Sequence, residues 1–211
     1  MRLHPDGWPF IALAMALNTF LFVLAGWYGL VLLPITLWCI AFFRDPDRNI
    51  PDGEGLVVSP ADGVLLPVAQ ASPPDELGMG PAPRTRLSIF MNVFNVHVNR
   101  MPAGGTVLKL AYRPGRFVNA SFDKASEHNE RMSIRLALNG GRELAVVQIA
   151  GLVARRIRCD LREGEMVRRG ARFGIIRFGS RLDVYLPDGA EVAVQDGARV
   201  KAGETVLARL A

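Results

Sequence analysis

The feature that most constrains this fold is a stretch of 37 residues, 7–43, that contains no charged side chain. One membrane crossing needs about 20 apolar residues, so this stretch is long enough to cross. A core helix of a soluble protein is rarely this long and this uniformly apolar. A cleavable signal peptide is disfavoured, because the run is too long and Arg44-Asp45-Pro46 follows it where a small-residue cleavage site would stand. The sequence therefore predicts a membrane-associated segment over residues 1–43 and a separate domain over residues 44–211.

The middle of the apolar stretch is interrupted by Gly26-Trp27-Tyr28-Gly29. Glycines permit a turn there, and aromatic residues favour a membrane–water interface. The pattern favours a helical hairpin with legs of about 17 residues, inserted wholly or in part, with one long tilted crossing as the alternative. Arg2 precedes the stretch, and Arg44 and Arg48 follow it. By the positive-inside rule, we expect both ends at the cytoplasmic face of the cell membrane.

The formal net charge of +5 belongs to residues 44–211, because the only earlier charges, Arg2 and Asp6, cancel. A basic domain suits an anionic partner. Three kinds are consistent with the charge: a membrane surface, a phosphorylated substrate or a nucleic acid. The two cysteines, Cys39 and Cys159, form neither a disulfide framework nor a metal-binding spacing. They fit a reducing compartment.

Residues 44–211 predict a mainly β domain, since short runs rich in Val, Ile, Leu and Phe are separated by Gly- and Pro-containing turns. Strands are expected over residues 56–58, 64–68, 84–91, 106–112, 132–138 and 143–149. Asn139-Gly140-Gly141, between the last two, is typical of a hairpin turn. Asp62-Gly63, between the first two, is a second hairpin-type signal, in which Asp62 would bond its own backbone.

Residues 175–187 predict a strand that is interrupted at Gly179-Ser180. Glycine adopts backbone angles closed to other residues and lets another group approach closely. Ser180 places a hydroxyl beside the carbonyl of Gly179. A β-bulge or tight bend is the simplest interpretation of the pair taken alone.

Three histidines are present, and His4 precedes the apolar stretch. His97 lies among β-branched residues, and His128 lies in a polar segment, residues 117–131. If the domain needs a base near neutral pH, these two supply its only imidazoles. A hydrogen-bonded structural role is the alternative for His97. The polar segment is either solvated surface or the lining of a site for a ligand with phosphate and carboxylate groups.

Two segments 33 residues apart, 164–170 and 197–203, share the pattern G-x-x-V-x-x-G. Each combines turn chemistry with flanking strands, so the last third of the chain holds an internal repeat. It resembles the hammerhead half-motif of biotinyl/lipoyl-type domains and of their duplicated relatives. The resemblance implies a β-sandwich of the barrel-sandwich hybrid type. The Met-Lys-Met site of a carrier domain is missing, so the resemblance indicates architecture and not chemistry.

Four segments follow one another in order: the apolar N-terminus, Ser-Pro-Ala-Asp-Gly at 59–63, Phe-Asn-Val-His-Val-Asn-Arg at 94–100, and Phe-Gly-Ser-Arg at 178–181. With Asn-Glu-Arg at 129–131, they resemble the phosphatidylserine decarboxylase family, in the short proenzyme type of bacteria and archaea. The resemblance covers nearly the whole chain.

This resemblance implies that the Ser180 hydroxyl attacks the Gly179 carbonyl and that the chain cleaves itself there. The products would be a β subunit, residues 1–179, and an α subunit, residues 180–211, which form a heterodimer. The resemblance leaves open whether heterodimers assemble into a higher oligomer. Ser180 would become a pyruvoyl group, the covalent cofactor of the family. That group forms a Schiff base with the amine of phosphatidylserine and promotes decarboxylation to phosphatidylethanolamine.

By the same resemblance, His97 is the base for self-cleavage and Asp62 orients it, in a triad-like arrangement with Ser180. Some longer family members carry two histidines three residues apart at this place. Here the second position is Arg100, which leaves His128 as a candidate proton donor for decarboxylation. The implied partners are phosphatidylserine and an anionic membrane surface, with neither a metal nor a nucleic acid.

Two other protein classes are alternatives. A membrane-anchored zinc endopeptidase would need a His-x-His pair and further ligands, whereas His97 is flanked by Val96 and Val98. A membrane-anchored β-sandwich adaptor predicts an intact chain and a Ser180 that tolerates alanine.

Overall fold

The computed structural model describes residues 2–115, 129–151, 157–177 and 179–210. It separates into two compact units. The first comprises Met1–Asp47 together with Val93–Val96, and the second comprises Arg48–Asn92 together with His97–Ala211. The predicted mainly β fold with an N-terminal apolar helical hairpin is confirmed.

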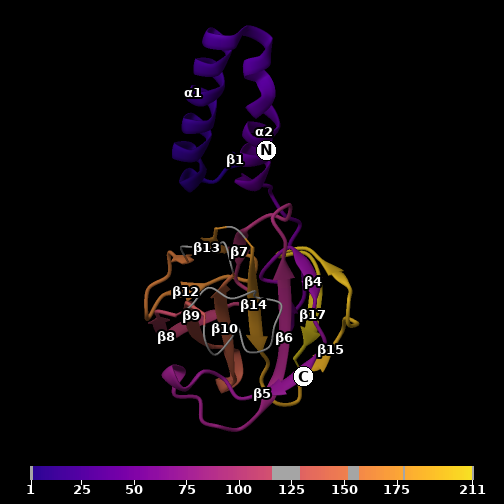
Figure 1. Cartoon of the computed structure of the whole chain (residues 1–211). Coiled ribbons are helices and arrows are strands. Elements are labelled where there is room, and N and C mark those ends of the chain that lie inside the picture. The colour runs from indigo at the N-terminus through magenta and orange to yellow at the C-terminus, as the bar shows by residue number, and fades with distance from the viewer. Residues whose placement is uncertain (1, 116–128, 152–156, 178, 211) are drawn as a thin grey trace. The chain divides into compact units, whose positions relative to one another are not determined.

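In the first unit, α1 (Trp8–Ala25) and α2 (Leu33–Phe42) run antiparallel and are joined by a 3₁₀ helix, Gly26–Leu32 (Figure 1). The predicted turn at Gly26 is therefore present, but the second helix is shorter than expected because the 3₁₀ helix takes its first turns. A short 3₁₀ helix, Pro5–Gly7, precedes α1. β1 (Arg2–Leu3) pairs with β2 (Arg44–Asp45), so the two ends of the hairpin lie together.

The hairpin is held closed by a close backbone approach and a polar contact. A Cβ added to Gly29 would lie 2.3 Å from the backbone of Leu21, so only glycine fits at this point. Asn18 of α1 donates a hydrogen bond to the Thr36 hydroxyl of α2, and both side chains are buried. Such small residues and interhelical polar contacts are what join helices in lipid.

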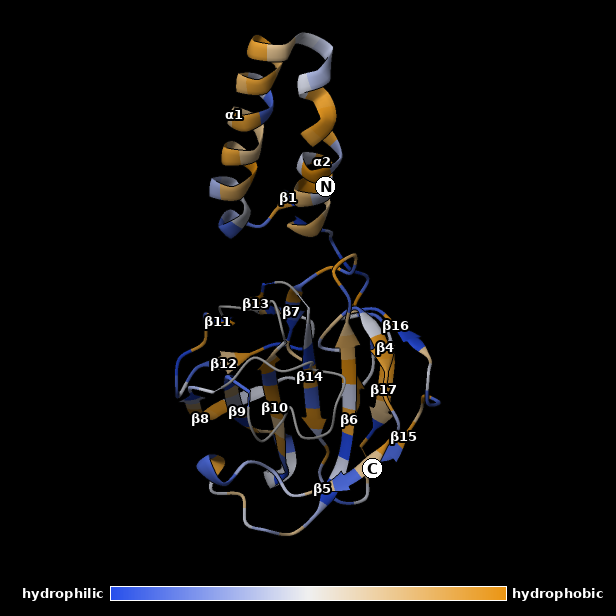
Figure 2. Cartoon of the chain, viewed as in Figure 1, coloured by the Kyte–Doolittle hydropathy of each residue, from blue (hydrophilic) through white to orange (hydrophobic). Residues whose placement is uncertain are grey.

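Most residues of α1 and α2 are hydrophobic, as the prevailing orange colour in Figure 2 shows, and many of their large apolar side chains are exposed. By length and composition, Pro5–Phe42 is apolar enough to cross a membrane. At 1.5 Å per residue α1 is about 27 Å long, close to the ~30 Å hydrocarbon thickness of a bilayer. Large side chains such as Val23, Trp27 and Tyr28 are more than three-quarters exposed. The hairpin therefore suits a lipid environment.

The second unit is built around a nine-stranded antiparallel sheet, counted over the described residues. Its strands follow the order β12-β8-β9-β10-β14-β6-β4-β16, and β5 also pairs with β6. The bounds are β12 (Met166–Val167), β8 (Gly105–Arg113), β9 (Arg131–Ala137), β10 (Glu143–Ala150), β14 (Ser180–Tyr185), β6 (Arg84–Met91), β4 (Gly63–Leu65), β16 (Arg199–Val200) and β5 (Ala69–Ala71). The β9–β10 hairpin turns through the 3₁₀ helix Asn139–Gly141, as predicted.

Two three-stranded sheets complete this unit in the described part of the chain. One has the order β11-β13-β7, with bounds Ile157–Cys159, Arg172–Ile176 and Val98–Arg100. The other has the order β15-β17-β3, with bounds Glu191–Val192, Val206–Arg209 and Leu56–Val58. A further 3₁₀ helix spans Asp75–Leu77. The sheets enclose an apolar core that includes Leu87, Ile89, Val146, Leu182 and Val184.

The two copies of the predicted repeat have equivalent geometry. Gly164 and Gly197 both have φ near +80° and donate to strand carbonyls, and Gly170 and Gly203 have φ of +76° and +77°. A Cβ on either Gly170 or Gly203 would collide with the same side chain, that of Ile50. The repeat is therefore a structural duplication whose two turns meet at Ile50.

The predicted hairpin at Asp62-Gly63 is wrong. β3 pairs with β17, whereas β4 pairs with β6 and β16. The two apolar runs flanking Asp62 thus enter different sheets, because each finds a longer-range partner. The expected strand 64–68 is also shorter, ending at Leu65.

Candidate active site

The predicted break at Gly179-Ser180 is the point where the chain passes from one sheet to another. β13 belongs to the three-stranded sheet with β7, whereas β14 begins at Ser180 in the centre of the large sheet (Figure 1). Gly179 has φ +68°, a left-handed conformation that other residues adopt at a cost. A Cβ added there would meet no described heavy atom within 4 Å. The glycine therefore serves the backbone conformation and not a tight fit.

Ser180 lies fully buried between two strands. Its Cα pairs with Met91 of β6 and with Ala150 of β10. Its hydroxyl oxygen is buried and has no hydrogen-bond partner among the described residues. A buried hydroxyl without a partner costs about 1–3 kcal/mol. A buried hydroxyl without a partner is expected where the hydroxyl takes part in a reaction.

His97 is brought to this break from 82 residues upstream. It directly precedes β7, and Val98 of β7 pairs with Ile175 of β13. The buried imidazole accepts a hydrogen bond from the Gly179 N–H at its Nε2, over 3.4 Å. A ring nitrogen that accepts a hydrogen bond carries no proton, so Nε2 is the basic nitrogen of this imidazole.

A buried amide pair links the strand of His97 to the large sheet. Gln148 of β10 donates to the Asn99 side-chain oxygen at 2.8 Å, and Asn99 Nδ2 lies 3.9 Å from the sulfur of Met91. Both amides are fully buried. Gln148 is not among the residues predicted from the sequence, although a single amide inside the apolar strand Glu143–Ala150 was a signal for it.

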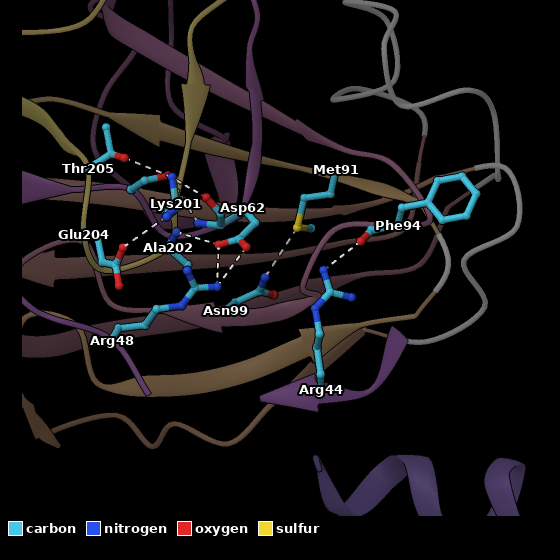
Figure 3. A network of polar contacts seen from close by, with 12 residues as sticks. Arg44, Arg48, Asp62, Met91, Phe94, Asn99, Lys201, Ala202, Glu204 and Thr205 are labelled. Carbon is cyan, nitrogen blue, oxygen red and sulfur yellow. Dashed lines mark hydrogen bonds and ion pairs between the residues drawn. The ribbon is translucent and has the colours of Figure 1, made fainter. Parts of the chain in front are cut away.

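Asp62 has other partners. Its carboxylate accepts two hydrogen bonds from Arg48, at 2.8 and 2.9 Å, and one from the Ala202 N–H at 2.8 Å (Figure 3). Within the described residues, His97 is not among the partners of this carboxylate. The structure thus brings His97 and Gly179-Ser180 together and places Asp62 in a separate ion pair, whose Arg48 the sequence analysis did not identify.

Asn129-Glu130-Arg131 leads into β9 next to the end of β10. Asn129 donates to the carbonyl of Ala150 at 2.7 Å, and Ala150 is the cross-strand neighbour of Ser180. Arg131 binds both carboxylate oxygens of Glu76 at 2.7 Å. Burial raises the pKa of Glu76, but hydrogen bonds from Arg131 and Ser133 outweigh it and leave that pKa below its ordinary value. His128 and most of the polar segment lie outside the described residues.

A fully buried ion pair follows Ser180 on β14. Arg181 binds both carboxylate oxygens of Asp183 at 2.7 Å, and neither side chain is exposed. Breaking one half of such a pair leaves an uncompensated buried charge, which costs about 3–5 kcal/mol. Both members of this pair lie on β14, so the two charges compensate each other within the strand that begins at Ser180.

Arg100 is buried and donates to the carbonyl of Gly170 at 3.0 Å. Among the described residues, no group of three His, Cys, Asp or Glu side chains is arranged to hold a metal. Cys39 and Cys159 are both free thiols.

Comparison with known proteins identifies close relatives over the full length. The family model for phosphatidylserine decarboxylase matches residues 35–208. The phosphatidylserine decarboxylase proenzyme of Paramagnetospirillum magneticum is 57% identical over 211 residues, which are 99% of this chain and 87% of the relative. The proenzymes of Cereibacter sphaeroides and Rhodospirillum rubrum are 56% and 54% identical, over 99% and 100% of this chain and 90% and 89% of their own lengths.

Proposed function

The chain belongs to the phosphatidylserine decarboxylase family and decarboxylates phosphatidylserine, and from this premise we propose that it makes its own pyruvoyl cofactor from Ser180 by cleaving the Gly179–Ser180 bond. One arrangement carries the proposal. A buried hydroxyl without a described partner follows a left-handed glycine whose N–H contacts an unprotonated imidazole nitrogen. The family membership favours this enzyme over the zinc endopeptidase and the adaptor.

Self-cleavage begins when Ser180 Oγ attacks the carbonyl carbon of Gly179 and the peptide nitrogen leaves. The product is an ester with a free amine on Ser180. Loss of the Ser180 α-proton then breaks the Cβ–O bond, which releases the Gly179 carboxylate and leaves a dehydroalanine. Tautomerisation to an imine and hydrolysis by one water release one ammonia and leave the pyruvoyl group.

His97 is the proposed base in these steps. A serine hydroxyl is a weak nucleophile at its ordinary pKa and needs a neighbouring group to accept its proton. The Nε2 atom accepts from the N–H of Gly179, whose own carbonyl is attacked, so the imidazole contacts the residue next to Ser180. The proposal requires the ring to turn from that N–H to the Ser180 hydroxyl. Hydrogen bonds of this kind are often long before the reactive complex forms.

Asp62 is proposed to orient His97, as the family resemblance implies. In the structure its carboxylate binds Arg48 and Ala202, so this role requires the carboxylate to exchange one of those partners. Asp62→Asn is then expected to slow self-cleavage and shift its pH dependence, whereas Arg48→Gln leaves that pH dependence unchanged. If both variants change the pH dependence of self-cleavage equally, the role of Asp62 is instead to bind Arg48.

The buried position of Ser180 fits a pyruvoyl group. Simple hydrolysis would leave a charged ammonium at a position that is fully buried beside Met91 and Ala150. Burying an unpaired ammonium costs several kcal/mol. A pyruvoyl terminus is neutral and avoids that cost. When formed, the group supplies a ketone for the substrate amine and an electron-withdrawing carbonyl for loss of carbon dioxide.

The cleaved chains are proposed to stay together as an αβ heterodimer. β14 of the α chain lies between β10 and β6, β16 pairs with β4, and β17 pairs with β3. Every one of these partner strands belongs to residues 1–179. Removing the α chain would therefore expose the apolar core and leave the strands of the β chain without their partners.

The proposed location is the cytoplasmic face of the cell membrane. The apolar hairpin returns both ends to one side through β1 and β2, which carry Arg2 and Arg44. A diacyl lipid leaves a bilayer at a cost of about 0.8 kcal/mol per exposed CH₂, so an enzyme attached to the bilayer reaches the headgroup more easily. The net positive charge of residues 44–211 favours binding of anionic phosphatidylserine at the membrane surface.

Intact-mass analysis of purified protein tests the proposal. We expect two chains, residues 1–179 and 180–211, the smaller one lighter than a serine terminus by the mass of one ammonia. Ser180→Ala leaves one uncleaved, inactive chain. Ser88→Ala is the matched control, because Ser88 is also buried on a central strand with no described partner for its hydroxyl, and that variant still cleaves. A single intact chain from an active preparation would falsify the proposal.

A further inference from the structure

A short loop of the β-rich sequence belongs to the hairpin unit. Val93–Val96, between β6 and β7, forms one compact unit with Met1–Asp47. Trp38 of α2 donates its indole N–H to the carbonyl of Val93 at 3.2 Å. Arg44 donates to the carbonyl of Phe94 at 2.8 Å. The loop is therefore tied to the base of the hairpin by two side-chain hydrogen bonds.

The side chain at the tip of this loop is exposed. Phe94 is 71% exposed, and Figure 3 shows its ring pointing away from the Arg44 guanidinium that binds its carbonyl. An exposed phenylalanine has a favourable free energy of transfer into an apolar phase. Backbone carbonyls usually oppose that transfer, because an unsatisfied carbonyl in lipid costs several kcal/mol. Here the carbonyls of Val93 and Phe94 already have donors.

The two donors are residue types that anchor proteins at the level of lipid headgroups. Tryptophan is enriched at membrane–water interfaces, and arginine reaches headgroup phosphates while its stem lies along apolar surface. Trp38 lies about one turn before the end of α2 at Phe42, and Arg44 follows that end in β2, where the charge-free stretch stops. The level they mark is the expected boundary between acyl chains and headgroups.

We propose that the loop Val93–Val96 is a third lipid-contacting element beside α1 and α2, and that Phe94 inserts among the acyl chains at the headgroup boundary. This inference rests on the proposed membrane attachment of the hairpin. The partner of the loop is the bilayer, because the loop forms one compact unit with a hairpin whose large apolar side chains are exposed. His97 directly follows Val96 in the chain. The loop that contacts lipid is therefore covalently continuous with the proposed base.

The test measures the depth of position 94 directly. Phe94→Cys is made in a Cys39→Ala, Cys159→Ala background, labelled with a nitroxide and reconstituted in vesicles of phosphatidylserine and phosphatidylcholine. Collision rates with oxygen, which partitions into lipid, and with a water-soluble nickel chelate are compared. We expect the label at position 94 to collide often with oxygen and rarely with the nickel chelate, like a label at Val23 on α1.

Met166→Cys is the matched control, because Met166 is an apolar residue of the second unit and is 81% exposed. Its label is expected to be accessible to nickel. If label 94 behaves like label 166, the inference is overturned. Dipolar broadening of label 94 that disappears on dilution with unlabelled protein would show that a second copy covers the loop, which also overturns it.

Activity supplies a second readout. Phe94→Ser is expected to lower kcat/KM for vesicle phosphatidylserine about tenfold, whereas Phe94→Leu keeps most of it. On a monomeric short-chain phosphatidylserine the Phe94→Ser variant should match the unmodified enzyme; equal losses on both substrates would contradict lipid contact. Self-cleavage is followed on the same samples, so failure of the proposed function appears as an uncleaved chain, independently of the depth of label 94.

Discussion

The left-handed conformation of Gly179 leads to a quantitative prediction for Gly179→Ala. An added Cβ would meet no described heavy atom within 4 Å, so packing does not oppose the change. The φ of +68° does oppose it, because an L-residue in this conformation costs about 1–2 kcal/mol. If the backbone of the resting variant relaxes out of this conformation and attack requires it, the same free energy is added to the barrier. We therefore expect self-cleavage to slow by about 5- to 30-fold.

The assay is the time course of conversion of newly refolded precursor into two chains, followed on denaturing gels. Gly189→Ala is the control, because Gly189 has φ +76° and equally open surroundings but lies in the turn after β14. It should lose similar stability and cleave at the normal rate. Cleavage of Gly179→Ala at the normal rate would show that the left-handed conformation is not part of the reactive state.

Three further predictions concern the stability of the fold and the geometry of the hairpin. Gly170→Ala should destabilise the fold by about 2–4 kcal/mol in denaturant titrations, since it combines a left-handed backbone with overlap against Ile50, and Ile50→Ala should relieve the overlap part. The pKa of Glu76 is lowered on folding, so its pairing with Arg131 stabilises the protein above the ordinary pKa of 4.5 and is lost as the pH falls through the lowered value; Glu76→Gln should therefore be less stable at neutral pH and equal to the unmodified chain in acid. Gly29→Val places a Cβ against the α1 backbone and should force the hairpin legs apart, measurable as a longer distance between spin labels on α1 and α2. An unchanged distance would mean that the legs are held together without this close approach.

Local sequence was sufficient wherever a structure depends on near neighbours. The charge-free stretch with Gly26 at its centre predicted the hairpin, and residues 84–91 predicted β6 with its observed bounds. The spacing of the glycines in 164–170 and 197–203 predicted two equivalent turns. In each case the signal is composition, periodicity or backbone freedom within one segment, which the segment carries with it into any fold.

The same reasoning was wrong at Asp62-Gly63, where a local turn signal suggested a hairpin that does not form. β3 and β4 each pair with strands from the far end of the chain, and Asp62 binds Arg48 and Ala202. Pairing with distant strands buries both apolar runs in the core. Turn chemistry permits a hairpin, but it does not decide which strands are neighbours.

Local sequence patterns were enough to predict an apolar hairpin, a β-rich domain with a duplicated turn, and a glycine–serine break in a strand. Only the tertiary structure placed His97 against Gly179, linked Asn99 to Gln148, and joined Val93–Val96 to the hairpin. These contacts connect residues that are tens of positions apart, and they follow from the order of strands in the sheets. That order depends on which faces can be buried together, a property of the whole chain that no single segment contains.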